Sequence, residues 1–522
     1  MLSNSRFDPV RNLRRASQLL FLLLFLYLFL QTRQTGQDEL GYPVRIFLDF
    51  DPLILLTTLL TTHSPARAFW LAGITILLTL LGGRIYCGWF CPLGTLHSLV
   101  SRLGRRNKEN TWQHLHSLKY FILIILVSSA LASMQLTGLL DPIALLIRSL
   151  SVSLYPLFNY GGKALFDTLY DWNLPLITDA SENLAAALRG NLFAFQPPYF
   201  RQGAFTGIFF IVILALNLLE KRFWCRYLCP LGALLGLFSR YAFFRRTVND
   251  ACTECRACEP ECHGNTSPAS RPGWLQSECY WCGNCKDICP GRSVSFGFSG
   301  NKTGEAVSLG RRRVVVAALS GVAVVPLLRA MPYKKIPTLE ARLIRPPGAL
   351  AEEEFLERCV KCGECMKVCT TNGLQPTLLE AGFEGIWSPL LVPRLGYCEF
   401  HCTLCGQVCP TGAIRPLNQE EKMRTRIGLA FIDRNRCLPW SLGLPCIVCE
   451  EVCPTPKKAI WLEERQVTGR DATTAVVQQP VVDPALCIGC GICEASCPIR
   501  DQPAIYVTCI GESRAEGNQL LL

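Results

Sequence analysis

Apolar residues dominate the first 245 positions of the chain, where they form long segments separated by short polar stretches. The segment at 18–30 follows four arginines and precedes no small-residue cleavage site, so it predicts an uncleaved transmembrane helix with its basic end in the cytoplasm. Three further segments, at 66–83, 118–136 and 204–219, each approach the ~20 residues that cross a bilayer. The pattern therefore predicts a polytopic α-helical membrane domain with four spans.

Two shorter apolar runs each begin with an Asp-Pro pair, DPLILL at Asp51 and DPIALL at Asp141. They are too short to span and are predicted to be re-entrant or interfacial half-helices. Each precedes a span and then a C-x3-C-P-L-G motif, because RIYCGWFCPLGTL at 84–96 returns 138 residues later as RFWCRYLCPLGAL at 222–234. Two crossings separate equivalent points, so the copies are expected to form a parallel repeat about an axis along the membrane normal.

The remainder of the chain is polar and rich in cysteine, apart from one apolar segment at 308–330. Arg311, Arg312 and Arg313 precede its mildly apolar core, as in a twin-arginine signal, which favours export of the domain on its C-terminal side. The alternative is retention inside, since Arg329, Lys334 and Lys335 reduce the charge asymmetry and the core is short for a span. The predicted organisation is a membrane domain (1–245), a two-cluster ferredoxin (246–300), a twin-arginine-like segment and anchor (301–332) and a four-cluster ferredoxin domain (333–522).

The formal charge of +11 on 522 residues does not indicate nucleic-acid binding, because the basic residues bracket apolar segments instead of forming a surface interleaved with aromatic residues. Positive loops remain on the cytoplasmic side of a membrane protein. The central ferredoxin is therefore expected inside, on the evidence of two basic groups: Arg102, Arg105, Arg106, Lys108 after the second span, and Arg240, Arg245, Arg246 before the ferredoxin.

The segment at 252–290 carries two C-x2-C-x2-C-x3-C runs, the signature of a bacterial two-cluster ferredoxin. Two runs of one spacing fit neither a zinc ribbon nor a disulfide framework, which are the alternatives. In this α+β fold the fourth cysteine of each run points at the neighbouring cluster. The expected ligand sets are Cys252, Cys255, Cys258 with Cys289, and Cys279, Cys282, Cys285 with Cys262.

Four more runs come after residue 333, two with standard spacing and two with a longer first gap. Their sixteen thiols predict four [4Fe-4S] clusters, which gives six in the chain. The spacing does not say which runs exchange their fourth cysteine, and Cys509 is left over as a buried structural thiol. The runs are Cys359, Cys362, Cys365, Cys369; Cys398, Cys402, Cys405, Cys409; Cys437, Cys446, Cys449, Cys453; and Cys487, Cys490, Cys493, Cys497.

The membrane domain holds further candidates for chemistry: Cys87, Cys91, Cys225 and Cys229 of the two C-x3-C-P motifs, and Asp51 and Asp141. The four thiols, paired on helical turns, could meet at the repeat axis and hold a metal or a further cluster, or cycle as redox thiols; the alternative is small buried packing residues. Each aspartate suits an N-cap before proline, or else an acceptor of quinol protons at membrane depth. The six histidines lack the paired placement of haem ligands, and the aromatic-rich insertion at 151–201 is expected on the outer face.

With these motifs in place, residues 1–300 resemble the NapH type of membrane ferredoxin, and residues 308–522 resemble its partner of the NapG type. The resemblance implies quinol oxidation on the membrane and electron delivery to a periplasmic reductase. Relatives of these families serve nitrous oxide reduction, methylamine oxidation and extracytoplasmic flavoproteins, so the terminal acceptor is not implied.

The expected function is electron transfer from quinol through six [4Fe-4S] clusters to an extracytoplasmic redox partner, by a multi-pass protein of the bacterial inner membrane. The protein would supply the spacing and potentials of the clusters, with a quinone as further cofactor. The alternatives are electron transfer from a soluble cytoplasmic donor, and a maturation factor that keeps a partner metalloprotein reduced.

Overall fold

The structure is a computed structural model that describes residues 9–34, 38–41, 43–63, 70–102, 112–172, 175–188, 192–194, 196–269, 274–298, 307–329, 342–468 and 474–515. Six basic residues that bear on membrane orientation lie outside these ranges: Arg6, Arg105, Arg106, Lys108, Lys334 and Lys335. The chain divides into two compact units. Unit 1 comprises 1–31, 43–149 and 205–327, and unit 2 comprises 32–42, 150–204 and 328–522.

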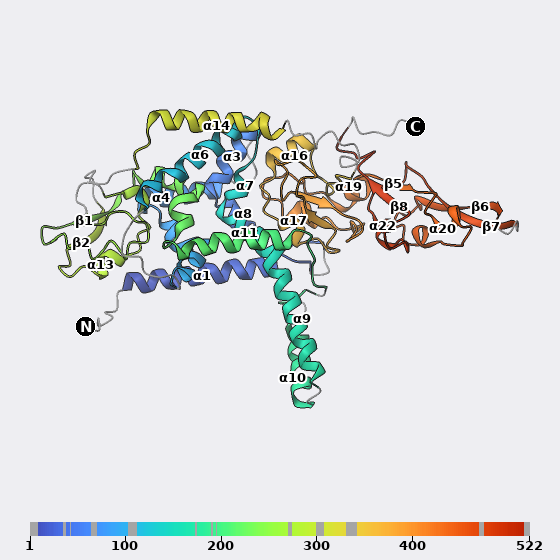
Figure 1. The fold of residues 1–522 in the computed structure, drawn as a ribbon, viewed down its shortest axis with the longest axis horizontal. Coiled ribbons are helices and arrows are strands. Elements are labelled where there is room, and N and C mark those ends of the chain that lie inside the picture. Colours follow the sequence, from blue (N-terminus) through green and yellow to red (C-terminus); the bar gives the residue numbers. More distant parts are fainter. Residues whose placement is uncertain are drawn as a thin grey trace. The chain divides into compact units, whose positions relative to one another are not determined.

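Unit 1 combines apolar helices with a small antiparallel sheet at one end of them (Figure 1). Its main helices are α1 (Pro9–Gln31), α3 (Pro52–Thr62), α4 (Trp70–Gly82), α5 (Pro92–Val100), α6 (His116–Leu131), α8 (Pro142–Ser149), α11 (Gly203–Ala215), α12 (Pro230–Ser239) and α14 (Arg311–Arg329). Short helices α2 (Ile46–Asp49), α7 (Thr137–Leu140) and α13 (Asn284–Asp287) connect them. Strands β1 (Phe244–Val248) and β2 (Val294–Phe298) pair with Arg246 opposite Phe296 and enclose the segment of the central ferredoxin runs.

Three of the described helices are long and apolar enough to cross a membrane: Pro9–Gln31, Gln113–Leu131 and Pro142–Asp171. The spans predicted at 66–83 and 204–219 correspond to shorter apolar helices, Trp70–Gly82 and Gly203–Leu218. The run after Asp141, predicted to be a half-helix, instead continues for 30 residues. It passes Pro156 because a π-helical turn at Leu150–Leu154 precedes α9 (Tyr155–Asp171) and places the proline in the first turn of that helix.

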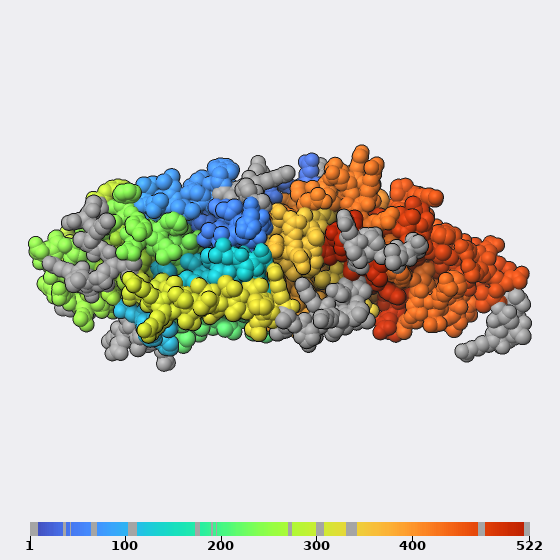
Figure 2. All heavy atoms as spheres, turned by 90° about the horizontal axis from the view of Figure 1, so that it is seen from above, coloured from blue at the N-terminus to red at the C-terminus, as the bar shows by residue number. Residues whose placement is uncertain are grey.

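The segment at 311–329 forms one helix, α14, although it is not among the three membrane-length apolar helices of the described residues. Ala317, Gly321 and Val325 are buried at a spacing of four residues. At Gly321 a Cβ atom would lie 1.9 Å from Ser128 Oγ, so α14 packs directly against α6 there. Figure 2 shows this helix on the surface of the molecule. The exposed apolar residues of its other face are Val315, Val316, Leu319, Val322 and Leu327.

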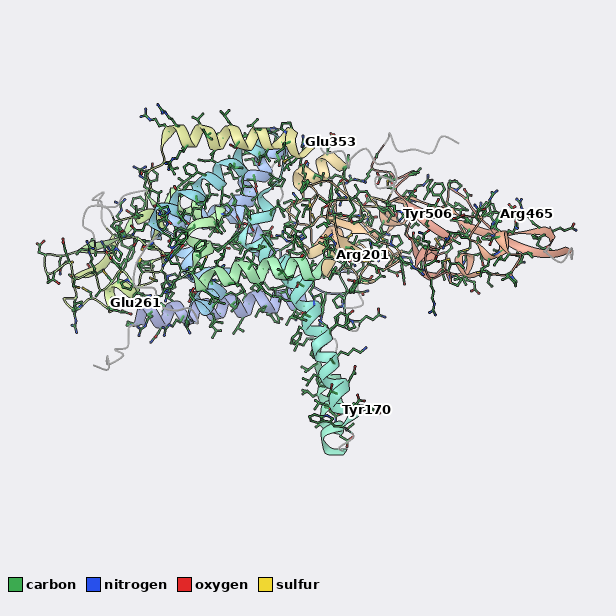
Figure 3. All side chains as sticks on the ribbon, in the orientation of Figure 1. Tyr170, Arg201, Glu261, Glu353, Arg465 and Tyr506 are labelled. Atoms are coloured by element: carbon green, nitrogen blue, oxygen red, sulfur yellow. The ribbon has the colours of Figure 1, made fainter. Side chains whose placement is uncertain are left out.

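Unit 2 holds short helices and two-stranded antiparallel sheets. The pairs are β3 (Leu374–Pro376) with β4 (Pro389–Leu391), β5 (Leu429–Ile432) with β8 (Ile505–Thr508), and the long hairpin β6 (Ile460–Thr468) with β7 (Thr474–Val482). Its helices are α16 (Glu352–Arg358), α17 (Glu364–Lys367), α18 (Leu404–Gln407), α19 (Gln419–Arg424), α20 (Leu438–Ser441), α21 (Val448–Glu451) and α22 (Ile492–Ser496). The insertion at 151–201 adds a helical hairpin, α9 with α10 (Pro175–Leu188), and exposed Tyr170 lies near its tip (Figure 3).

Candidate iron–sulfur sites

Four cysteines of the central ferredoxin line one cavity in unit 1. Cys279, Cys282 and Cys285 come from the second run, and Cys262 comes from the end of the first. Gly283, with φ of 78°, makes the turn before α13 and thereby aims Cys285 inward. Four thiols around an apolar cavity suit a [4Fe-4S] cluster, and this quartet is the one that ligand exchange predicts.

The other quartet of the central ferredoxin lies nearer the surface. Cys255 is exposed, and Cys252, Cys258 and Cys289 are partly exposed. The Sγ of Cys289 lies 3.1 Å from Ser293 Oγ. The assignment of Cys289 to the cluster of Cys252, Cys255 and Cys258 stays a prediction.

In the described part of unit 2, four cavities are each lined by four cysteines, three from one run and the fourth from another. If these cavities hold the clusters, ligand exchange joins the first run with the second and the third with the fourth, a choice that the spacing left open. The quartets are Cys359, Cys362, Cys365, Cys409; Cys369, Cys398, Cys402, Cys405; Cys437, Cys446, Cys449, Cys497; and Cys453, Cys487, Cys490, Cys493.

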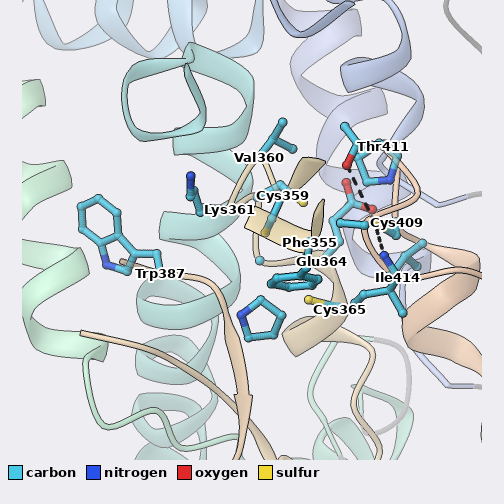
Figure 4. A pocket seen from close by; sticks show the side chains of 16 residues that line it. Phe355, Cys359, Val360, Lys361, Glu364, Cys365, Trp387, Cys409, Thr411 and Ile414 are labelled. Carbon is cyan, nitrogen blue, oxygen red and sulfur yellow. Dashed lines mark hydrogen bonds between the residues drawn. The ribbon is translucent and has the colours of Figure 1, made fainter. Parts of the chain in front are cut away.

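The first of these cavities shows how the exchange arises (Figure 4). Cys365 lies on α17, whereas Cys409 follows α18 and reaches the cavity together with Pro410. The backbone N–H of Ile414 donates a hydrogen bond to Cys409 Sγ at 3.4 Å. Phe355 and Trp387 complete a mostly apolar wall. Cys509, which belongs to no run, is buried in the core of this unit.

The two C-x3-C-P motifs have the same local structure. The prediction that each cysteine pair shares one helical turn is wrong, because a π-helical turn carries the first cysteine (Tyr86–Phe90 and Trp224–Leu228) and the second is extended. Cys91 and Cys229 cap α5 and α12, accepting hydrogen bonds from the N–H groups of Gly94 at 3.4 Å and Gly232 at 3.3 Å. The prolines end the turn and begin these helices.

The four thiols of the motifs are buried, and Cys229 lies within electrostatic range of the other three. Within the described ranges, no group of three or more His, Cys, Asp or Glu side chains is placed to hold a single metal ion. Ligands of a cubane bind four different irons and lie further apart, so this finding bears on a mononuclear site only.

Arginines from the two repeats make reciprocal contacts. Arg84 reaches the carbonyl of Cys225 at 3.5 Å, and Arg222 reaches the carbonyl of Cys87 at 3.3 Å. Both guanidinium groups lie over the ring of Tyr280, at 4.6 Å and 5.0 Å from its centroid. The two copies therefore face one another around a residue of the central ferredoxin.

Tyr280 is a residue of the central ferredoxin that contacts both copies of the membrane repeat. It lies between Cys279 and Cys282, and its hydroxyl donates to the carbonyl of Cys225 at 3.0 Å. A Cβ atom on Gly88 would lie only 2.4 Å from the Tyr280 carbonyl, so glycine is required for this approach. The indole N–H of Trp89 donates to the carbonyl of Trp281 at 3.2 Å.

Glu278 anchors the same loop through charge. Its buried carboxylate accepts hydrogen bonds from Arg84 at 2.7 Å, from Tyr120 at 2.8 Å and from Lys119. Burial alone would raise the pKa of Glu278, but Lys119, Arg84 and His116 outweigh it and hold that pKa at about 2. The sequence analysis did not identify Glu278 and Tyr280 as functional residues. The recurrence of an arginine at the start of each repeat, Arg84 and Arg222, was a signal that these positions have partners elsewhere in the chain.

Together the repeated helices and the cysteine-lined cavities define an iron–sulfur electron-transfer protein of the ferredoxin type. A family described as 4Fe-4S binding domain matches residues 65–111 and 202–249, the two repeat copies, and another of the same description matches 480–500. No solved structure matches the chain.

Similar proteins include the ferredoxin-type protein NapH of Escherichia coli, 27% identical over 46% of this chain and 71% of the relative. The ferredoxin-type protein NapG of Escherichia coli is 36% identical over 25% of this chain and 57% of the relative. An uncharacterized protein of Methanocaldococcus jannaschii is 24% identical over 56% of this chain and 99% of the relative. The chain thus combines a NapH-like part and a NapG-like part, as its motifs predict.

Proposed function

We propose that the protein oxidises quinol in its membrane repeat and passes the electrons through six [4Fe-4S] clusters to an extracytoplasmic redox partner. The observation that carries this proposal is the position of Tyr280. The loop that supplies Cys279 and Cys282 to one quartet touches both C-x3-C-P motifs, so the first cluster would lie next to the site where the repeats meet. NapH and a relative described as a putative electron transport protein support the electron-transfer role.

Quinol-dependent reduction of the clusters tests this function. In anaerobic membranes, menaquinol or ubiquinol should reduce the clusters. Electron paramagnetic resonance measures this reduction. A soluble low-potential donor acting alone would instead support the cytoplasmic-donor alternative, and reduction by neither would favour a maturation factor.

Gly88→Ala should slow quinol-dependent reduction roughly ten- to a hundredfold, because the added Cβ pushes the Tyr280 loop away from the repeat. Reduction by dithionite, which needs no such approach, should be unchanged. The matched control is Gly73→Ala on α4, where a Cβ meets nothing within 4 Å. Equal quinol-dependent rates in the two variants would contradict the proposed route.

Delivery to an external partner requires the cysteine-rich domain after residue 342 to lie on the extracytoplasmic side of the membrane. The exposed apolar face of α14 suits contact with lipid, and Arg311, Arg312 and Arg313 begin the helix. In right-side-out vesicles we therefore expect protease to digest the domain after residue 342, and a reporter active only outside to work when fused after Leu522. Protection of this domain would exclude an extracytoplasmic partner.

A further inference from the structure

Two carboxyl groups from different repeats meet in the core of unit 1. Asp51 caps α3 and Asp141 caps α8, and both side chains are fully buried. The two side chains also lie within interaction distance of one another. Each aspartate therefore has the predicted N-cap role. That role uses only one of the two carboxyl oxygens, Oδ1, and does not account for the other.

The oxygens of each carboxyl group have different partners. Oδ1 of Asp51 accepts from the N–H groups of Leu53 at 2.8 Å and Ile54 at 3.3 Å. Oδ1 of Asp141 accepts from Ile143 at 3.0 Å and Ala144 at 2.8 Å. Oδ2 of each aspartate is buried and meets no N–H or O–H donor among the described residues. Because ionised carboxylates only accept hydrogen bonds, two neighbouring carboxyl groups whose Oδ2 atoms meet no donor can pair only if one of them carries a proton.

The surroundings stabilise one negative charge here and oppose a second. Two helix N-termini point at the carboxyl groups, which favours one shared charge. A second charge would be a like charge in contact with the first, with no donor for the facing oxygens. Arg148 and Tyr86 are charged or titratable groups within electrostatic range of the pair, and the guanidinium of Arg148 donates to the carbonyl of Gly138 at 2.8 Å.

Tyr86 connects this pair with the thiols. Its hydroxyl is buried and has no hydrogen-bond partner in the described part of the chain. The side chain lies within electrostatic range of both aspartates and of Cys87 and Cys91. The Tyr86 side chain is therefore a polar group close to both the carboxyl pair and the C-x3-C-P site.

We propose that Asp51 and Asp141 form one acid pair that shares a single proton and is the proton acceptor of the membrane repeat. The role as acceptor rests on the proposed function. Oxidation of one quinol releases two electrons and two protons; each electron reduces one cluster, the pair takes up one proton to become doubly protonated, and the other proton leaves separately. The shared proton itself needs no quinol and is a property of the resting protein.

Infrared spectroscopy of the purified full chain, labelled with carbon-13 at the aspartate carboxyl group, tests the pair. At neutral pH the wild type should show the carbonyl band of a protonated aspartic acid, shifted by the label and by deuterium oxide. Asp51→Asn and Asp141→Asn should each abolish this band. Asparagine keeps the N-cap, and its amide can donate to the remaining carboxylate, so the fold should persist.

Asp49→Asn is the matched control, since Asp49 is a buried aspartate two residues before Asp51, and it should leave the band intact. Absence of the band in the wild type, its loss in only one of the two pair variants, or its loss with Asp49→Asn would each overturn the shared proton. If the band is intact but quinol does not reduce the clusters, the proposed function is wrong and the shared proton of the aspartate pair is still supported.

Discussion

Replacement of Glu278 by glutamine is expected to destabilise unit 1 by about 3 to 5 kcal/mol, because it leaves buried cations without their counter-charge. Arg84, Lys119 and Glu278 are all fully buried, and the carboxylate is the anion that both cations contact. The expected consequence is a ferredoxin loop that no longer docks on the repeat. Chemical unfolding in detergent, followed by the fluorescence of the tryptophans, measures the change.

Glu261 offers a matched control on the same ferredoxin segment (Figure 3). Its ion pair with Lys221 spans 3.5 Å, and both side chains are 25% exposed, so Glu261→Gln should change stability by no more than about 0.5 kcal/mol. Adding Lys119→Met to Glu278→Gln removes one unpaired cation and should recover part of the loss. Equal effects of the two glutamate variants would show that the buried network does not hold the loop.

Removal of Cys409 should cost the cluster of Cys359, Cys362 and Cys365 and leave the cluster of its own run intact. The cavities place Cys409 with the first run and Cys369 with the second. With four irons per cluster, iron should fall from about 24 to about 20 atoms per chain in Cys409→Ala. Iron and acid-labile sulfide on anaerobically purified protein give this number.

Double variants reveal which cysteines share a cluster. Cys359→Ala with Cys409→Ala should lose no more iron than either single variant, about 4 atoms, because both remove ligands of one cluster. Cys359→Ala with Cys369→Ala should lose about 8 atoms, since two clusters are affected. The reverse pattern would show that each run keeps its own fourth cysteine. Cys509→Ala is the control and should retain all the iron.

Short-range features of this protein could be predicted from sequence because their causes are local. The spacing of Cys279, Cys282 and Cys285 places three thiols around one turn, and a glycine such as Gly283 supplies the positive φ that the turn needs. The caps at Asp51 and Asp141 arise from an acid before proline, and the repeat was visible in its motif. The continuation of the Pro142–Asp171 helix past Pro156 could not be predicted, because a π-helical turn has no simple sequence signal.

The remaining features depend on which segments pack together across long separations. Cys409 rather than Cys369 completes the first quartet because α17 and α18 pack side by side, and no spacing rule states that. Glu278 and Tyr280 resemble ordinary loop residues until the fold places Glu278 against Arg84 and Lys119, and Tyr280 between Arg84 and Arg222. Asp51 and Asp141 could each be recognised alone from the chain. Only the tertiary structure brings the two carboxyl groups close together, because residues 90 positions apart meet only when the two repeats face one another.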